Sequence, residues 1–397
     1  MAEVAVPMAK AAPIARPKLH PLTSMRFGAA ALVAFHHFAL LGGVHPSNRW
    51  LDSLLGLGYV SVNFFFVLSG FVLAWNYIGD AGEFRVDGRR FWLARIARLY
   101  PAYALALIFA LPHFIEFAVR GGAPVPGVVP LTNPWIVAAT TITTPLLLQV
   151  WVGLLTWNAV AWSLSVEAFF YLTFPLIAPG IGRASRTRLI VLAVLVAAAP
   201  ILLTSVVFAS ALGRSASWYE FSTLTEGFFY ASPLIHWPEF ALGVIVGRLF
   251  QLRSLDGRQT RWKPRYEYLA VGGTCVLLLV FGLLPEAMFV ATMAPVFGWL
   301  IFSLAHGQSG LARVLSLPVL ILLGNASYSL YLFHAVFIQA FVDNAKMFGS
   351  TWMLSWPAFV LCFLLTAAFT IVVFLKVEEP ARDWILRKWQ KRPALDG

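Results

Sequence analysis

Charge is the scarcest property of this 397-residue chain. Asp, Glu, Lys and Arg together make up 12% of it, about half the charged fraction of an ordinary soluble domain. Hydrophobic residues make up 59%, and apolar runs of about 20 residues, the length that crosses a roughly 30 Å hydrocarbon layer, recur from Gly28 almost to the C-terminus. A water-soluble globule is excluded, and the chain is predicted to be an all-α polytopic membrane protein.

Cysteine is nearly missing. The two cysteines, Cys275 and Cys362, both fall inside apolar runs, where they are expected to be small core residues rather than partners in a disulfide. No Cys or His spacing requires a metal site. Acidic residues are also few, so the net charge is +11. Because Lys and Arg lie between the apolar runs, we interpret this excess as a topology signal and not as a nucleic-acid-binding face.

Ten apolar runs are long enough to span a bilayer. They cover residues 26–44, 54–78, 99–119, 159–179, 188–212, 233–250, 267–284, 287–305, 318–341 and 354–376. An eleventh candidate, Trp135 to Trp151, is interrupted by four threonines and Pro145. The chain shows no internal repeat of the kind that marks many secondary transporters.

The positions of Lys and Arg decide between ten and eleven spans. With ten spans and the N-terminus inside, all Lys and Arg lie on the cytoplasmic side except four: Arg49, Arg120, Arg214 and Lys346. An eleventh span would move most of them outside. The positive-inside rule therefore favours ten transmembrane helices with both termini cytoplasmic, in a bacterial inner membrane. Trp135 to Trp151 is then an external, non-spanning segment, which can enter the membrane only where it packs against protein.

The same pattern predicts the domain organisation. Residues 1–21 are rich in Ala and Pro and lack the apolar core of a cleaved signal, which favours a disordered cytoplasmic tail. Residues 22–380 are predicted to form the ten-helix membrane domain, and residues 381–397 a basic cytoplasmic tail.

Ionisable residues at membrane depth are functional candidates, because burying them costs several kcal/mol unless they are paired or hydrated. The candidates are Arg26, His36, His37, His113, Glu116, Glu167, His236, Glu239 and His334. Simpler interpretations stay open for some of them. A lone intramembrane histidine is often only a packing residue, Glu116 can be hydrated at the outer interface, and the arginines at residues 89–98 can be topology charges alone.

Helical spacing places several candidates on common faces. Arg26 and His37 are eleven positions apart, so they share a face with about 16 Å of rise between them. Ser163 and Glu167 form an i, i+4 pair. A further stack in residues 318–341 consists of Ser327, Tyr331 and His334.

Depth separates the candidates into two groups. His37, Glu167, Glu239 and His334 are expected at middle to outer depth. Arg26, Arg95 and Arg98 are expected at the inner rim. The asymmetry predicts a donor site below and an acceptor chamber above.

Seven ordered motifs carry a resemblance to a known family. They are Arg26-x10-His37, the stretch Gly58 to Phe71, Arg95-x-x-Arg98-x-x-Pro101, Trp162-Ser-Leu-Ser-x-Glu167, Pro238-Glu239-x-x-x-Gly243, Gly324 to His334, and Glu378-x-Pro380. From about Leu22 to Trp384 the chain resembles the acyltransferase 3 family, integral-membrane acyltransferases that act mainly on sugars.

The resemblance implies an acyl-CoA co-substrate, commonly acetyl-CoA, with no permanently bound cofactor. The implied acceptor is a hydroxyl of a polysaccharide, a glycolipid or a macrolide-type product. It also implies that Arg26 and His37 are essential and that Glu167, Arg95 and Arg98 are functional, with a weaker implication for Ser327, Tyr331 and His334.

The chain departs from the family pattern at three places. His36 stands where many members have an aromatic residue, so a second imidazole could share the role of His37. His236 occupies the region where some members carry an arginine. The extra extracytoplasmic esterase-like domain of some relatives is not expected, because only about twenty residues follow the last predicted span.

These residues suggest a mechanism. A histidine is a natural general base because its ordinary pKa of about 6.5 lies near operating pH, so His37 is assigned that role. Glu167 is the candidate to orient the imidazole or to position the acceptor. One guanidinium group can donate two parallel hydrogen bonds to the oxygens of a phosphate. The three inner-rim arginines are therefore assigned to the phosphates of CoA.

The supporting residues and the route complete the prediction. The residues expected to support the acceptor are His36, Glu239, Ser327, Tyr331 and His334. Direct transfer in a ternary complex is preferred, and an acyl-histidine relay stays open. One rival function is a proton-coupled transporter or flippase of a lipid-linked sugar, and the other is a structural or sensory membrane protein.

Overall fold

The structure, a computed structural model, describes residues 16–122, 129–155, 157–209, 231–257, 262–281 and 286–390. Within these ranges the chain is almost wholly helical, and its β-structure there is one isolated bridge between Ile78 and Phe84. The predicted all-α fold is confirmed.

A long helix lies over each of the ten predicted spans. In the described ranges these are α1 (His20–Gly42), η1 (Leu57–Val60) continued by α3 (Ser61–Tyr77), α4 (Gly88–Arg120), α6 (Trp162–Arg183), α7 (Arg186–Ala209), α9 (Pro233–Leu255), α10 (Pro264–Phe281), α11 (Glu286–Leu304), α13 (Pro318–Met347) and α14 (Trp356–Val373). Shorter elements are α2 (Arg49–Gly56), α5 (Pro134–Thr143), η2 (Gln149–Trp151), η3 (Ala159–Ala161), α12 (Gly310–Leu315), the π-helix η6 (Phe374–Glu378) and α15 (Glu379–Gln390).

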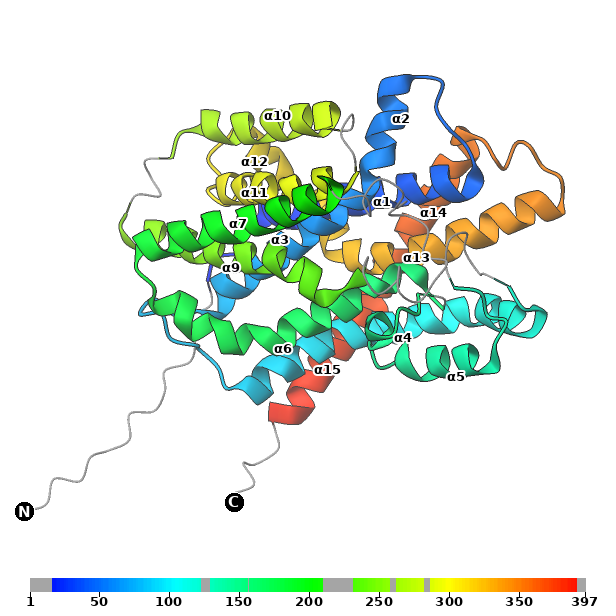
Figure 1. Ribbon diagram of the computed structural model, residues 1–397, viewed down its shortest axis with the longest axis horizontal. Helices are drawn as coiled ribbons and strands as arrows, with labels where there is room; N and C mark the ends of the chain where they lie inside the picture. Colours follow the sequence, from blue (N-terminus) through cyan, green and yellow to red (C-terminus); the bar gives the residue numbers. More distant parts are fainter. Residues whose placement is uncertain are drawn as a thin grey trace, which may run out of the picture.

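Six helices of the described chain are long and apolar enough to cross a membrane. They are His20–Gly42, Leu57–Tyr77, Gly88–Arg120, Ala159–Arg183, Pro318–Met347 and Trp356–Trp389. Most of the long helices run along the longest axis of the molecule, with α3 near its centre (Figure 1). The chain is an integral membrane protein by these criteria.

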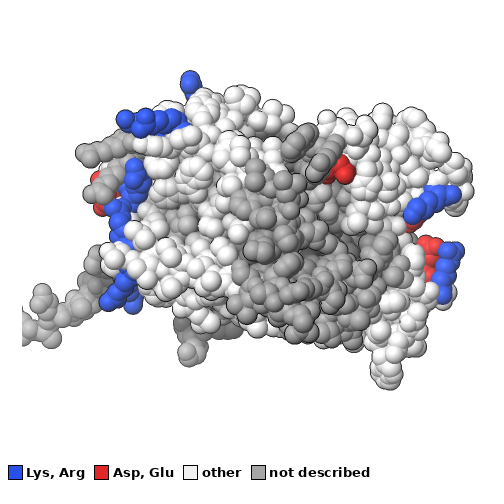
Figure 2. All heavy atoms as spheres, turned by 45° about the horizontal axis from the view of Figure 1, so that its top comes forward, with Lys and Arg blue, Asp and Glu red and all other residues white. Residues whose placement is uncertain are grey.

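Charged side chains gather at the two ends of this axis. On the face that Figure 2 shows, Lys and Arg cluster at one end, and a smaller group of acidic and basic residues lies at the other. The first end includes the start of α4 and the end of α9, with Arg90 and Arg253. The second includes an ion pair of 2.6 Å between Arg120 and Glu116. A mostly uncharged band between the ends is what a membrane requires.

The segment from Trp135 to Trp151 does not form a spanning helix. Its helix α5 has ten residues, about 15 Å of rise, which is half the hydrocarbon thickness. The segment packs against protein: the Tyr103 hydroxyl donates to the Thr144 carbonyl at 2.5 Å, and Gln149 donates to the Ala161 carbonyl at 3.0 Å. Such backbone pairing is the condition for non-helical chain near a membrane.

The centre of the fold is the contact between α3 and α9. A Cβ on Gly70 would collide with the Phe240 carbonyl oxygen, and one on Gly243 with the Val67 carbonyl oxygen. Glycine at these positions lets the two backbones touch. Helices α1 and α13 approach in the same way, because Gly324 lies against the Thr23 carbonyl.

The predicted tails fall mostly outside the described residues. Residues 1–15 of the N-terminal tail and residues 391–397 of the C-terminal tail are not described, and the same is true of Arg214. His20 and Pro21, assigned to the first tail, open α1. Residues 381–390 of the second tail belong to α15, which packs beside α4.

Candidate functional site

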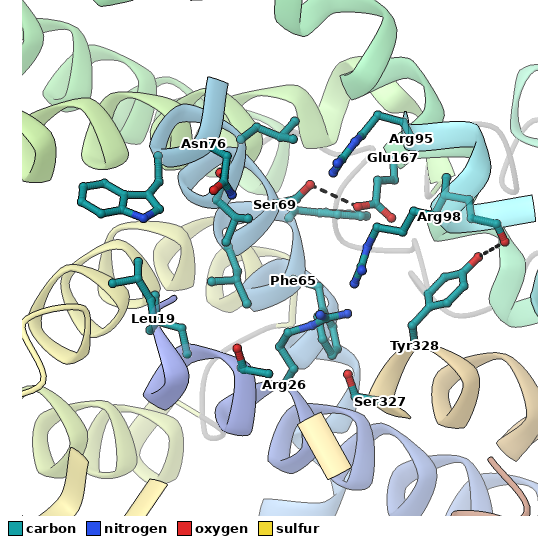
Figure 3. A pocket seen from close by; sticks show the side chains of 18 of the residues that line it. Leu19, Arg26, Phe65, Ser69, Asn76, Arg95, Arg98, Glu167, Ser327 and Tyr328 are labelled. Carbon is teal, nitrogen blue, oxygen red and sulfur yellow. Dashed lines mark hydrogen bonds between the residues drawn. The ribbon is translucent and has the colours of Figure 1, made fainter. Parts of the chain in front are cut away.

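A cavity of about 360 Å³ lies within the helix bundle. Its mouth is lined by the exposed residues Lys18 and Asn76. Side chains of α1, α3, α4, α6 and α13 form its walls, as Figure 3 shows. Six predicted site residues line it: Arg26, Arg95, Arg98, Glu167, Ser327 and Tyr331.

Arg26 and Arg98 bring two guanidinium groups into this cavity from α1 and α4 (Figure 3). Both residues are only partly exposed, and among the described residues neither guanidinium forms a hydrogen bond or an ion pair. A cation withdrawn from water without a partner is costly. The arrangement therefore favours an anionic ligand with oxygen acceptors.

Arg95 is held in place by aromatic rings. Its Nη2 donates to the Tyr77 hydroxyl at 2.8 Å. The guanidinium carbon lies 5.2 Å from the centroid of the Tyr77 ring and 5.7 Å from that of Tyr171. These cation–π contacts fix the direction of the group, and its buried Nε has no partner in the structure.

Glu167 is the carboxylate of the cavity. Its Oε1 accepts from the Ser69 hydroxyl at 3.1 Å (Figure 3) and from the Tyr171 hydroxyl at 2.5 Å. Within the described chain it makes no hydrogen bond to His37. In this structure Glu167 therefore faces the cavity, and its hydrogen-bond partners there are Ser69 and Tyr171.

The deep end of the cavity is polar on one wall. The Ser163 hydroxyl lies 2.8 Å from the Tyr331 hydroxyl, which in turn lies 3.0 Å from the Val160 carbonyl oxygen. Ser327 is one turn nearer the mouth and donates to the Gly324 carbonyl at 2.7 Å. The predicted stack on this helix is present, and its first two members line the cavity.

His37 and His334 meet just beyond this end. Nε2 of His334 lies 3.2 Å from Nδ1 of His37, although the residues are 297 positions apart. Neither lines the cavity, but the Tyr331 ring, which does, has its centroid 5.7 Å from that of His334. The His37 face thus lies about 16 Å along α1 from Arg26.

His36 and Glu239 do not line the cavity. The ring centroid of His36 lies 5.5 Å from that of His37. Nδ1 of His36 lies 3.2 Å from the Leu55 carbonyl oxygen, in the turn before α3. Glu239 accepts from Asn63 at 2.6 Å and lies 3.4 Å from Nδ1 of His236. This polar cluster ties α9 to α3 and does not line the cavity.

Sequence reasoning missed several residues of the site. Ser69 and Tyr171 hold Glu167, and Tyr328 lines the cavity while donating to the Leu99 carbonyl at 2.8 Å. Tyr171 follows Glu167 by four residues, so helical spacing alone could have predicted that pair. The Ser69 contact joins two helices and leaves no such signal.

Glu378 is a further buried acid. It is 1% exposed and accepts from Ser329 at 2.8 Å, while its Oε1 has no partner in the structure. It ends the π-helix η6, and such turns are frequent at functional sites. It lies near enough to Arg98 and Arg26 for an electrostatic interaction with both guanidinium groups.

Comparison of the chain with known proteins identifies its family. Residues 20–375 match the acyltransferase 3 family, described as an acyltransferase domain. Acyltransferase MdmB of Streptomyces mycarofaciens is 28% identical over 338 residues, which cover 81% of this chain and 79% of that protein. O-acetyltransferase OatA of Staphylococcus aureus is 25% identical over 373 residues, 87% of this chain and 56% of OatA.

This chain therefore spans little more than half the length of OatA. No solved structure matches. The family match covers most of the chain and includes every helix that lines the cavity, and so the protein belongs to the acyltransferase 3 family.

Proposed function

We propose that this protein is a membrane-embedded O-acyltransferase that moves an acyl group, most simply acetyl, from acyl-CoA to a hydroxyl of a sugar or glycosylated acceptor. One observation carries the proposal: a cavity with two guanidinium groups that form no ion pair within the described chain ends beside a contact between the part-buried His37 and the buried His334. The relatives named as an acyltransferase and an O-acetyltransferase support the reaction class.

Acyl-CoA is the donor that suits this cavity. Its phosphates are anions with the oxygen geometry that guanidinium groups bind in pairs, and Arg26, Arg95 and Arg98 are assigned to them. A cavity of about 360 Å³ lies in the lower range of ligand sites. It suits the narrow thioester arm, with the nucleotide end nearer the mouth.

The chemistry assigned to the site is acyl transfer to an alcohol. His37 accepts the proton of the acceptor hydroxyl while the oxygen attacks the thioester carbonyl carbon. The carbon–sulfur bond then breaks, CoA leaves as the thiolate, and the proton on His37 returns to the sulfur. Glu167 is assigned to position substrate, since its carboxylate faces the cavity.

The proposed topology has ten membrane crossings with both termini in the cytoplasm of a bacterial cell. The Lys- and Arg-rich end in Figure 2 is then cytoplasmic, so the cavity opens to the compartment that contains acyl-CoA. Single cysteines test this after Cys275 and Cys362 are replaced by alanine. Arg90→Cys should resist an impermeant thiol reagent added outside intact cells, while Met347→Cys should react. Labelling of both, or of Arg90→Cys alone, contradicts the topology.

The reaction is tested with acetyl-CoA radiolabelled in the acetyl group. Membranes that contain the protein are incubated with the label and with bacterial glycans or glycolipids. Label should move into the sugar or glycolipid fraction, and membranes with His37→Ala should transfer about 10²- to 10⁴-fold less of it. Label that stays on CoA with every acceptor, together with movement of a lipid-linked sugar, would favour the flippase alternative.

A further inference from the structure

His37 and His334 form the one contact between imidazole nitrogens within hydrogen-bond distance in the described chain. They come from α1 and α13, whose backbones approach closely at Gly324 and Thr23. His334 is 1% exposed, so each nitrogen of its ring needs a partner within the protein. The partners determine which nitrogen carries the proton.

The protonation of His334 follows from its own helix. Its Nδ1 lies 3.3 Å from the carbonyl oxygen of Leu330, one turn earlier. A carbonyl oxygen can only accept, so Nδ1 must carry the hydrogen. Nε2 of the neutral ring is then an acceptor, and it is the atom that faces His37.

The same reasoning applies to His37. Its Nδ1 lies 2.9 Å from the Val33 carbonyl oxygen and 3.2 Å from Nε2 of His334. A hydrogen on Nδ1 of His37 serves both acceptors. The opposite assignment would leave a bare nitrogen lone pair against a carbonyl oxygen in each ring, at 2.9 and 3.3 Å, which is repulsive.

We propose that His334 is a positioning residue that holds His37 in the Nδ1-protonated tautomer, so that Nε2 of His37 is the proton acceptor of the reaction. The inference rests on the proposed function, in which His37 is the general base. In this inference the partner of His37 is the neutral imidazole of His334, whereas the sequence led us to expect the carboxylate of Glu167.

The arrangement suits a buried base. When Nε2 takes the proton of the acceptor hydroxyl, His37 becomes a cation whose Nδ1–H still points at the lone pair of His334. A hydrogen bond from a charged donor is about twice as strong as a neutral one. The pair therefore stabilises the protonated intermediate without placing a second permanent charge at this depth.

Two variants of His334 separate positioning from packing. His334→Gln can place its Oε1 near the site of Nε2 and keep an acceptor, whereas His334→Phe keeps a ring and removes it. We expect His334→Phe to lower kcat about 10- to 100-fold with an unchanged KM for acetyl-CoA, and His334→Gln to recover most of this loss. The Val33 carbonyl still holds His37 in both, which limits the effect.

His306 provides a matched control. It is a largely buried histidine whose Nδ1 also lies near the carbonyl one turn earlier, 2.8 Å from Phe302, and it lies outside the cavity. His306→Gln and His306→Phe should leave kcat unchanged. Equal kcat in His334→Phe and the parent, or equally low kcat in both His334 variants, would overturn the inference.

The tautomer is measured directly by nitrogen-15 NMR of histidine-labelled protein in detergent, without turnover. The parent should show His37 protonated at Nδ1, and His334→Phe should show a share of the Nε2-protonated form. A parent protonated at Nε2 refutes the inference whatever the activity. If instead His37→Ala retains full transfer, the proposed function fails, and this outcome is separate from the NMR result.

Discussion

The cavity lined by Arg26, Arg95 and Arg98 and the pair formed by His37 and His334 lie on the same side of α1, but they differ in charge and in burial. The cavity holds the guanidinium groups of Arg26 and Arg98, which form no hydrogen bond or ion pair with the described residues, beside a mouth with exposed residues. The pair lies deeper in the bundle, with the His37 Nδ1 and both His334 nitrogens near a partner. Permanent charge is kept where water or an anionic ligand can reach it, because deeper burial would cost several kcal/mol.

Under the proposed function, the residues assigned to donor binding and to chemistry are separated along one helix. Arg26 and His37 share a face about 16 Å apart, and Tyr331 lies between the cavity and the His334 ring. If the separation is real, substitutions at the two ends should change different kinetic constants.

The largest effect is expected at the histidine end. His37→Ala removes the proton acceptor, and general-base catalysis contributes about 10²- to 10⁴-fold, so kcat should fall by that factor with an unchanged Kd for acetyl-CoA. Single-turnover kinetics and equilibrium binding measure the two constants. A variant that loses acetyl-CoA binding instead would remove the distinction between the two regions.

The second effect is expected at the arginine end. Arg26→Ala and Arg98→Ala each remove a charged hydrogen-bond donor, worth about 1.5–3 kcal/mol, so the KM for acetyl-CoA should rise about 10- to 100-fold. The fall in kcat should be much smaller. Arg26→Lys keeps the charge without the paired geometry and should give an intermediate KM. Unchanged KM in all three would exclude these arginines from donor binding.

The third prediction concerns the charge behind the arginines. Glu378→Gln keeps the shape of the side chain but removes the anion that attracts Arg98 and Arg26, and we expect the protein to lose about 1–3 kcal/mol of stability. A lower melting temperature in detergent measures this loss. Glu379→Gln is the control, because the Glu379 side chain, next to Glu378 in the sequence, is 46% exposed and forms an ion pair with Arg382. Equal melting temperatures for the two variants would contradict the assignment.

The smallest effect is expected at the boundary. Tyr331→Phe keeps the ring but removes the hydroxyl that joins Ser163 to Val160. One net hydrogen bond is worth about 0.5–1.5 kcal/mol, so kcat/KM should fall about 2- to 10-fold. A loss as large as that of His37→Ala would show that the hydroxyl itself takes part in the chemistry.

The helices were predictable from sequence because run length and hydropathy are local properties. Each predicted span has a helix over it, and the segment Trp135 to Trp151 forms only a short helix. The common face of Ser327 and Tyr331 followed from helical spacing alone. The family resemblance stated from the motifs is confirmed by the match over residues 20–375.

Contacts between distant helices were not predictable in this way. Nothing local indicates that His334 touches His37 or that Ser69 touches Glu167, since the pairs are separated by 297 and 98 positions. The sequence placed Glu167 and His37 at a similar depth in the membrane. Whether the two side chains touch depends on which faces of α1 and α6 pack against other helices, and depth does not determine that. The way in which α1 and α13 cross depends on positions such as Gly324. The sequence does not show that this glycine packs against the Thr23 carbonyl.

The interlocked glycines of α3 and α9 have a mechanical consequence. If α3 shifted along α9 so that a neighbouring residue took the place of Gly70, the side chain of Ser69 or Phe71 would meet the Phe240 carbonyl oxygen, where no Cβ fits. Overpacking of this kind costs at least about 1–3 kcal/mol. The backbone contact with α9 therefore opposes sliding of the wall that carries Ser69, and it holds that wall in one register.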